Sequence, residues 1–323
     1  MGNLFASDPP PPRSPVYSTR IPTPPPSPPK PPPTEFARPF PHVGFDPTYG
    51  ADLLRAMFER EREPEFDDTQ EWLKYRRILV DWTMEYGDYV GARPSVMHSA
   101  ISMLDRVLKV TKVPRDQLGA TAIACAHMAI KFEEKEEDVP TIPTIREYTQ
   151  GQFNFTSKVM MQNEWRIFRA LKWNLTTYNA LHFTMHWFAQ GVVYSTDRVI
   201  GRPCNERVVV YLRKYVDFLA DLCLQDYSFQ QFRESVKGAA FLYSGRRALS
   251  IDPIWPDRLA QITTYSKEDL SECANAVWSY YRGQFPNART ANEMISEELE
   301  IRSLIFNPVI CCFQRTRWSQ HIV

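Results

Sequence analysis

The sequence predicts an all-α fold with two successive helical bundles, at about residues 70–176 and 178–283, and one helix before them. Apolar residues recur at steps of three and four throughout this region, which is the spacing of one face of a helix. No alternating apolar and polar run followed by a hairpin turn competes with this pattern. We therefore expect helices to form the whole core.

The first predicted helix is Asp52–Glu63, which is amphipathic and ends before Pro64, because proline disfavours the helical conformation in the preceding residue. The next covers Trp72–Tyr86, where apolar side chains at steps of three and four are those of Trp72, Tyr75, Leu79, Trp82 and Tyr86. Ile78 and Val80 fall beside this stripe, so the helix is apolar around most of its girth and needs partners on two faces. A buried strand over Ile78–Trp82 is the alternative interpretation of this short apolar run.

Further helices follow in both bundles. Met97, Ile101, Leu104 and Leu108 continue the helical spacing, and the alanine-rich segment 119–134 predicts a central helix that its neighbours approach closely. In the helix Ser157–Trp173 we expect four buried residues, which are Met160, Trp165, Phe168 and Leu171. The second bundle is predicted from residues 178–190, 205–224, 229–249, 256–263 and 266–283, with one more helix over 291–306.

The first 50 residues hold 17 of the 27 prolines, and proline cannot donate a backbone hydrogen bond, so a disordered, polyproline-like arm is expected. Ser14, Thr23 and Ser27 each precede a proline and are candidate sites for a proline-directed kinase. Chance placement in a proline-rich arm is the alternative. Myristoylation of Gly2 is disfavoured, because Ala6 stands where that signal prefers Ser or Thr.

Composition narrows the function classes. Lys and Arg total 38, as do Asp and Glu, so no net charge attracts the chain to nucleic acid or to a membrane surface. The six cysteines form no C-x-x-C pair, which opposes a zinc site or a disulfide framework and favours a reducing compartment, the nucleus or the cytoplasm. The longest nearly apolar stretch, Gly119–Ile130, is too short to span a bilayer.

The sequence offers no recognisable active site. The glycines are never spaced as G-x-G, which excludes the dinucleotide fingerprint, and no Ser or Cys lies in a nucleophile elbow. His182 and His186 have the spacing of a zinc pair but lack the glutamate that follows the first histidine in metalloproteases. The acidic run Glu133–Asp138 is read as a solvated loop. We expect a binding protein without metal or cofactor, not an enzyme.

Four segments in order resemble the cyclin box: RRILVDW from Arg76, LDRVL from Leu104, LGATAIACAHMAIKFEE from Leu118, and NEW before LKWNLT. The resemblance covers about residues 49–283. It implies two five-helix repeats preceded by a helix, and activation of a cyclin-dependent kinase. The implied divisions are an arm (1–48), an N-terminal helix and linker (49–69), a first box (70–176), a second box (178–283) and a tail (284–323).

The cyclin-box signature falls on Arg76, Asp105, Ala120, Lys131 and Glu164. The resemblance implies an internal ion pair between Arg76 and Asp105. The residues alone are compatible with it, because a half-buried guanidinium needs a carboxylate for its donors. Lys131 and Glu164, with Ile130 and Phe132, are implied to bind helix C of the kinase and hold it in the active position. Plain surface charge is the alternative for Lys131 and Glu164.

The resemblance also implies a shallow groove for Arg-x-Leu peptides of substrates and inhibitors, formed by Tyr75, Ile78, Leu79, Trp82, Glu85 and Leu118. Tyr75 stands where the family usually has Met, Gly119 where Gln is frequent, and Ala120 where Leu is usual. The loop Glu133–Ile145 is longer than is common. Some segments are similar to D-type cyclins and RRILVDW to the mitotic A and B types, so the subclass stays open. A cyclin-box scaffold or transcription-type factor that binds no kinase is the competing hypothesis.

Overall fold

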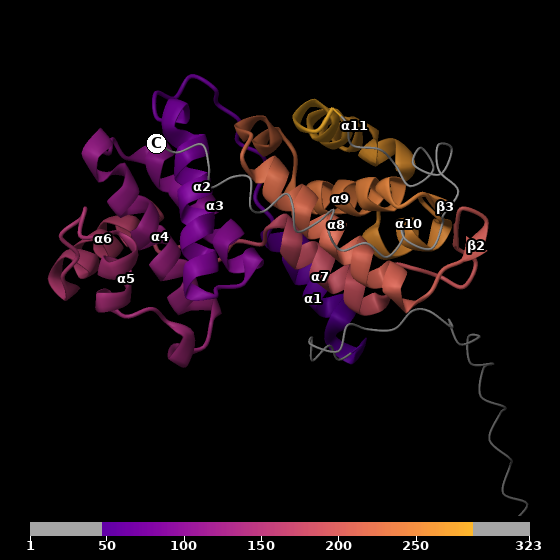
Figure 1. Cartoon of the computed structure of the whole chain (residues 1–323), viewed down its shortest axis with the longest axis horizontal. Coiled ribbons are helices and arrows are strands. Elements are labelled where there is room, and N and C mark those ends of the chain that lie inside the picture. The colour runs from indigo at the N-terminus through magenta and orange to yellow at the C-terminus, as the bar shows by residue number, and fades with distance from the viewer. Residues whose placement is uncertain (1–46, 287–323) are drawn as a thin grey trace, which may run out of the picture. The chain divides into compact units, whose positions relative to one another are not determined.

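The computed structural model describes residues 47–286 of the chain (Figure 1). The predicted phosphorylation sites Ser14, Thr23 and Ser27, the acylation alternative at Gly2 and the predicted helix over 291–306 all lie outside these residues. Within them, none of the helices is both long and apolar enough to cross a membrane.

The first bundle is built around an alanine-rich helix. In residues 73–170 its α-helices are α2 (Leu73–Val90), α3 (Pro94–Val110), α4 (Leu118–Glu133), α5 (Ile142–Tyr148) and α6 (Ser157–Ala170), with short 3-10 turns η1 (Arg115–Gln117) and η2 (Glu136–Asp138). Helix α4 packs against α2, α3 and α6, and every residue from Ala122 to Ile130 is buried. The small side chains let three neighbours approach one helix, as predicted.

The second bundle repeats this plan around α9. In residues 180–284 its α-helices are α7 (Ala180–Gln190), α8 (Glu206–Leu224), α9 (Glu234–Ala248), α10 (Asp257–Thr263) and α11 (Lys267–Gln284), with the 3-10 turn η3 (Tyr227–Gln231) before α9. Helix α9 packs against α7, α8 and α11. A Cβ atom on Gly238 would lie 2.9 Å from the carbonyl oxygen of Ala180, so glycine is required where α9 crosses α7.

The all-α prediction is confirmed, with corrections of detail. Helix α2 rules out the strand alternative over Ile78–Trp82. Helix α5 was not predicted, and the helix predicted from residue 229 begins at Glu234. A small antiparallel sheet was also missed: β1 (Arg198–Val199) pairs with β2 (Arg202–Pro203) and with β3 (Ile251–Asp252). Strands of two residues are too short to show an alternating pattern.

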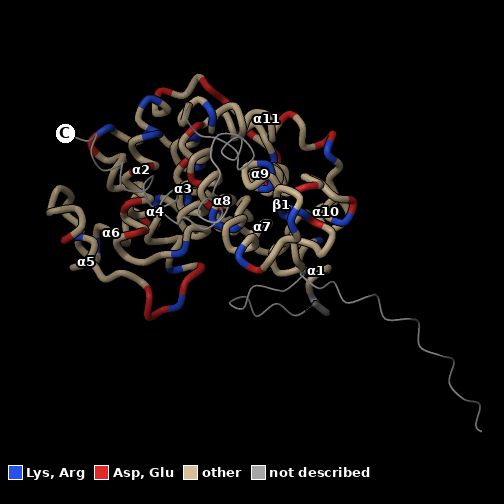
Figure 2. The backbone as a smooth tube through the Cα atoms, turned by 45° about the vertical axis from the view of Figure 1, so that its right-hand side comes forward, with Lys and Arg blue, Asp and Glu red and all other residues tan. Residues whose placement is uncertain are grey.

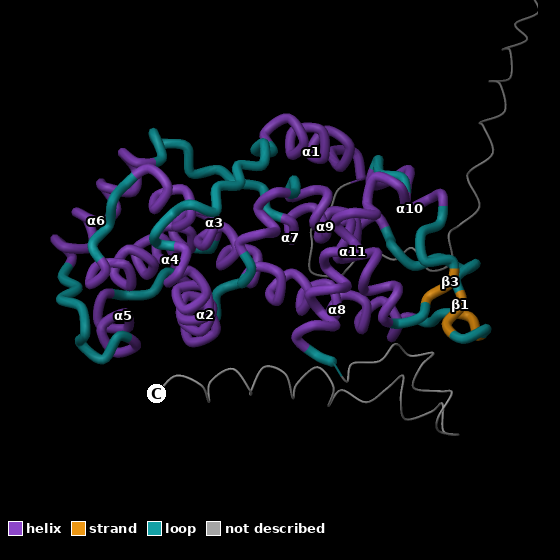
Figure 3. Tube along the Cα trace, turned by 90° about the horizontal axis from the view of Figure 1, so that it is seen from above, coloured by secondary structure: helices purple, strands orange, loops and turns teal. Residues whose placement is uncertain are grey.

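Helix α1 (Pro47–Arg60) precedes the first bundle in sequence but packs against the second. Figure 3 shows α1 beside α7. Met57 is buried in the core of the second bundle, and the ring centroids of Phe58 and Phe183 lie 5.3 Å apart. The apolar face predicted for this helix therefore covers α7, and residues 61–72 lead the chain from one bundle to the other.

Polar contacts join the two bundles. The guanidinium of Arg76 on α2 donates to the carbonyl oxygens of Leu224 and Gln225 at the end of α8, at 2.8 and 3.3 Å. The ring of His98 on α3 lies 2.9 Å from the carboxylate of Asp221. The side-chain amide of Asn179 donates to the carbonyl oxygen of Ser95 at 2.7 Å and to the hydroxyl of Ser99, one turn later on α3, at 3.0 Å. The start of α7 is thereby fixed to α3.

We expect Asn179→Ala to lower the free energy of unfolding by about 2–4 kcal/mol, against about 1 kcal/mol for Asn205→Ala. Both side chains cap a helix by accepting from backbone N–H groups. Only Asn179 also binds the other bundle, so its removal additionally breaks two buried hydrogen bonds, to Ser95 and Ser99. Denaturant unfolding of both variants measures the difference. Equal losses would show that the contact between the bundles contributes nothing.

Candidate functional site

Arg76 and Asp105 lie together between α2 and α3. The Nε and Nη2 atoms of Arg76 donate to the two carboxylate oxygens of Asp105, each at 2.9 Å. The side chains are 2% and 12% exposed. A two-point bond of this kind satisfies a buried guanidinium far better than a single contact does. The remaining Nη1 atom makes the contacts with α8 described above, and the ring of Tyr227 lies 5.3 Å from the guanidinium carbon.

Lys131 and Glu164 lie side by side, on α4 and α6. The Nζ atom of Lys131 is 3.0 and 3.3 Å from the two carboxylate oxygens of Glu164. Lys131 is 48% exposed, whereas Glu164 is only 14% exposed. His127, one turn earlier on α4, lies 3.8 Å from the same carboxylate, and burial lowers the pKa of His127. In this pair the ammonium group is therefore exposed to solvent, whereas the carboxylate is mostly buried.

Large exposed apolar side chains lie near this pair along the chain. Phe132, which follows Lys131, is 52% exposed, and Trp165, which follows Glu164, is 48% exposed. Met161, on the preceding turn of α6, is 52% exposed. The indole of Trp165 packs edge-on against Trp173, with centroids 5.5 Å apart. We call Phe132, Met161, Trp165 and Trp173 the aromatic patch.

Two predictions around this surface need correction. Trp165 was expected in the core, but the buried stripe of α6 runs through Met160, Ile167 and Leu171. Ile130, expected to contact a kinase, is 1% exposed and packs in the core of the first bundle. Of the two apolar residues predicted for this surface, Phe132 alone is exposed.

The six residues predicted to form a peptide groove come from α2 and the start of α4. Leu79 and Leu118 are 7% and 5% exposed and could only form its floor, whereas Ile78 is 59% exposed. Tyr75 and Trp82 are half-buried, and Glu85 is exposed. The guanidinium of Arg115 lies over the ring of Tyr75, at 5.2 Å from its centroid. Helical spacing puts five of these residues at neighbouring positions on α2, whereas Leu118 comes from α4.

Phe153, which the sequence did not single out, closes one end of this surface. Its ring lies 5.9 Å from that of Trp82. A Cβ atom on Gly119 would lie 2.7 Å from the tip of the Phe153 ring and 3.3 Å from the Trp82 ring. The glycine at this position therefore has a packing reason: Phe153 fills the space that a side chain would take.

Figure 2 shows acidic and basic residues interleaved along the described chain. Among residues 47–286, no group of three His, Cys, Asp or Glu residues could hold a metal ion. His182 instead accepts a hydrogen bond from the backbone N–H of Asn179, at 3.2 Å. The cysteines of this part are free and buried, and burial raises the pKa of Cys204 to about 11.

Comparisons with known proteins agree with this geometry. Residues 53–176 match the family model described as the N-terminal domain of cyclins, and residues 205–295 match that of the C-terminal domain. Human cyclin-J is 28% identical over 229 residues, which are 69% of this chain and 58% of that protein. A cyclin-D of Ostreococcus tauri is 30% identical over 213 residues, 63% of this chain and 56% of that protein. The chain thus spans less than two thirds of the length of these relatives.

A solved structure shows the same fold. The viral cyclin from herpesvirus saimiri superposes with a TM-score of 0.53, at 17% identity, and the match covers 76% of this chain and 99% of that one. Two five-helix repeats, a leading helix and matches to both cyclin domains define a cyclin-box protein. The chain belongs to the cyclin family.

We expect Gly119→Ala to destabilise the fold by about 1 kcal/mol, because the Phe153 ring must move away from Trp82. In a Phe153→Ala background the same change should stabilise it by about 0.5–1 kcal/mol, as alanine does in a helix. Gly283→Ala is the matched control, since nothing lies within 4 Å of its added Cβ. Thermal unfolding of the four variants measures the coupling. The same effect of Gly119→Ala in both backgrounds would contradict the packing explanation.

Proposed function

We propose that the chain binds a cyclin-dependent kinase and activates it by holding the kinase's helix C in the inward, active position. The observation that carries the proposal is the exposed Lys131 next to Glu164, with exposed Phe132 and Trp165 as their chain neighbours. A protein kinase holds ATP productively once its strand lysine pairs with the glutamate of helix C. A partner that binds the inward helix more tightly than the outward one shifts this equilibrium.

The expected free energies of binding differ between the charged pair and the apolar side chains. Reversing a 1:99 equilibrium takes about 5.5 kcal/mol of differential affinity. An exposed ion pair contributes about 0–1 kcal/mol, whereas burying one large apolar side chain contributes about 1.5–3 kcal/mol. The aromatic patch must therefore supply most of the affinity, and Lys131 and Glu164 fix the position of the bound helix through directed hydrogen bonds.

In this proposal the chain regulates a kinase and does not itself catalyse a reaction. The kinase would perform phosphoryl transfer, and this chain would set when it is active, in cell-cycle control. The free cysteines fit the reducing nucleus or cytoplasm, where such a kinase would meet it. A kinase-independent scaffold or transcription-type factor is the competing hypothesis. It gives no reason for large apolar side chains to remain exposed around Lys131 and Glu164.

The surface of Tyr75, Ile78 and Trp82 is the proposed docking groove for Arg-x-Leu peptides of substrates or inhibitors. Exposed Ile78 and half-buried Trp82 would receive the peptide's leucine, and exposed Glu85 would attract its arginine. Phe153 bounds the surface beside Gly119. Phe153 would therefore favour peptides with a small residue at that end.

Replacing both Lys131 and Glu164 by alanine should weaken kinase binding by about 2 kcal/mol, or about 30-fold in Kd, because the bound kinase would bury both groups and its own hydrogen-bonding partners would be left unpaired. The control is Arg213→Ala with Asp217→Ala, an ion pair at 3.0 Å on α8 of the second bundle, which should leave binding unchanged. Affinity purification against a panel of cyclin-dependent kinases, followed by a kinase assay, provides both readouts. Undiminished binding by a folded double variant would place the kinase surface elsewhere.

Ile78→Ala should weaken the binding of an Arg-x-Leu peptide about 10-fold, because a large apolar contact is lost. Its exposure means that the fold itself should be unaffected. Trp82→Ala should act in the same direction. The control is Val110→Ala, since Val110 is 65% exposed on α3. Fluorescence anisotropy of a labelled peptide measures the change, and an unaltered Kd for both groove variants would remove the groove from the proposal.

A further inference from the structure

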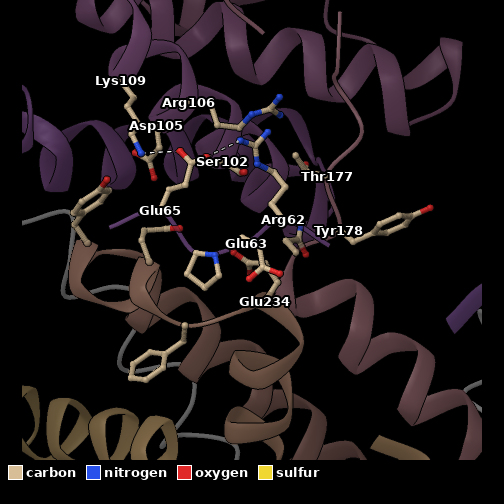
Figure 4. Close-up of a pocket in the computed structure, with 15 residues that line it drawn as sticks. Arg62, Glu63, Glu65, Ser102, Asp105, Arg106, Lys109, Thr177, Tyr178 and Glu234 are labelled. Carbon is tan, nitrogen blue, oxygen red and sulfur yellow. Dashed lines mark hydrogen bonds and ion pairs between the residues drawn. The ribbon is translucent and has the colours of Figure 1, made fainter. Parts of the chain in front are cut away.

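A cavity with several charged side chains in its lining lies where the two bundles and the segment after α1 meet. Its volume is about 80 Å³, several times the roughly 10–15 Å³ that one water molecule needs. Its walls come from residues 62–65, from α3 and from the connection that precedes α7, with Gln230, Phe232 and Glu234 of the second bundle closing it (Figure 4). It is separate from the Lys131–Glu164 surface.

Two guanidinium groups, those of Arg62 and Arg106, lie next to one another in this cavity (Figure 4). Arg106 donates through Nη2 to the carbonyl oxygen of Asn174 at 2.5 Å, while its Nη1 atom is buried without a hydrogen-bond partner. Burial and the charge of Arg62 lower the pKa of Arg106 to about 10, so the group stays charged at neutral pH. Such a charge calls for an anionic partner.

Each carboxylate that lines the cavity binds another cation directly, and Glu65 acts on Arg62 and Arg106 only at longer range, through its charge. Asp105 is held by Arg76, and Glu65 by Lys109 at 2.7 Å. Glu63 binds Arg233 at 2.5 Å, and Glu234 binds Lys237 at 2.7 Å. Arg62 has only a distant contact with Glu65, at 3.8 Å.

A buried hydroxyl completes the site. Thr177 is 7% exposed, lines the cavity and has no partner for its Oγ1 atom. Ser102 of α3 also lines the cavity. An unpaired buried hydroxyl costs about 1–3 kcal/mol, so a bound acceptor would recover free energy. Two guanidinium groups in one cavity, with Thr177 as a lining residue, match the several acceptor oxygens and double charge of a phosphate.

We propose that this cavity binds a phosphorylated serine or threonine, and that the ligand is one of the Ser/Thr-Pro sites of the chain's own arm. Ser14, Thr23 and Ser27 carry the required hydroxyl groups. The arm joins α1, and α1 ends at Arg60, two residues before Arg62. The site and its ligand are therefore tethered to each other, which raises their effective concentration.

The chain is long enough for this contact. The 20 residues from Ser27 to Pro47 reach about 60 Å if extended at about 3.1 Å per residue, and α1 with its 14 residues is about 21 Å long. Ser27 can therefore pass the whole helix and reach Arg62. The proposed partner kinase would be one source of the phosphate, but the site itself does not depend on the Lys131–Glu164 surface.

The test uses a labelled peptide of residues 20–33, with and without phosphate on Ser27, and the full chain. We expect the phosphorylated form to bind at least 10-fold more tightly, and Arg106→Gln to abolish this preference. Thr177→Val should also weaken phosphopeptide binding. Because this change removes an unpaired buried hydroxyl, the free energy of unfolding should stay the same or rise slightly. If Thr177 had only a structural role, affinity would fall only together with stability. Lys135→Gln, at a 77% exposed side chain, is the control.

A preference for the phosphopeptide that survives Arg106→Gln in a folded variant, or no preference in the native chain, would overturn the site. The assignment to the arm has its own test. Full chain phosphorylated on Ser27 should no longer bind the labelled phosphopeptide, since its own arm occupies the cavity. If it binds as tightly as before, or if inorganic phosphate binds as tightly as the peptide, the arm is not the ligand. No kinase partner is present in these measurements, so they stand apart from the test of kinase binding.

Discussion

One buried guanidinium holds the architecture together. Arg76 binds both oxygens of Asp105 and also donates to the carbonyl groups that end α8, where the helix dipole is negative. A single side chain thus joins α2, α3 and the second bundle. Removing one partner of such a buried pair costs about 3–5 kcal/mol, because the other charge is left without compensation. The proposed groove surface lies on α2, which this contact fixes, whereas the proposed kinase-binding surface lies on α4 and α6, which pack against α3.

Much of the fold could be predicted from sequence because its helices are long and periodic. Helix α5 could not be found this way, since its seven residues contain Pro143 and follow an acidic run. Proline is nevertheless tolerated in the first turn of a helix, and Thr141, which caps α5 by accepting from the N–H of Thr144, was a readable start signal. The place of α1 was beyond sequence patterns, because an apolar face does not specify which bundle it covers.

The positions of candidate site residues could be predicted where those residues belong to the motif itself. They could not be predicted where packing determines which side chains are buried. Lys131 and Glu164 are neighbours across α4 and α6, as the resemblance implied. Trp165 was misassigned because successive residues point about 100° apart around a helix. Glu164, one residue earlier and only 14% exposed, takes the place in the stripe between Met160 and Ile167. Phe153 carried no signal of its own: its role depends on the absence of a side chain at Gly119.

The seating of α1 on the second bundle has a practical meaning for dissecting the molecule. Cleaving the chain in the connection before α7 would leave Met57 and Phe58 on the first fragment, although they pack against the second bundle. The second fragment would then expose Phe183. Glu61 would leave too, with its hydrogen bonds to Ser235. The packing unit of the second bundle therefore includes α1, although α1 precedes the first bundle in sequence. A self-sufficient second half would need α1 grafted back onto it.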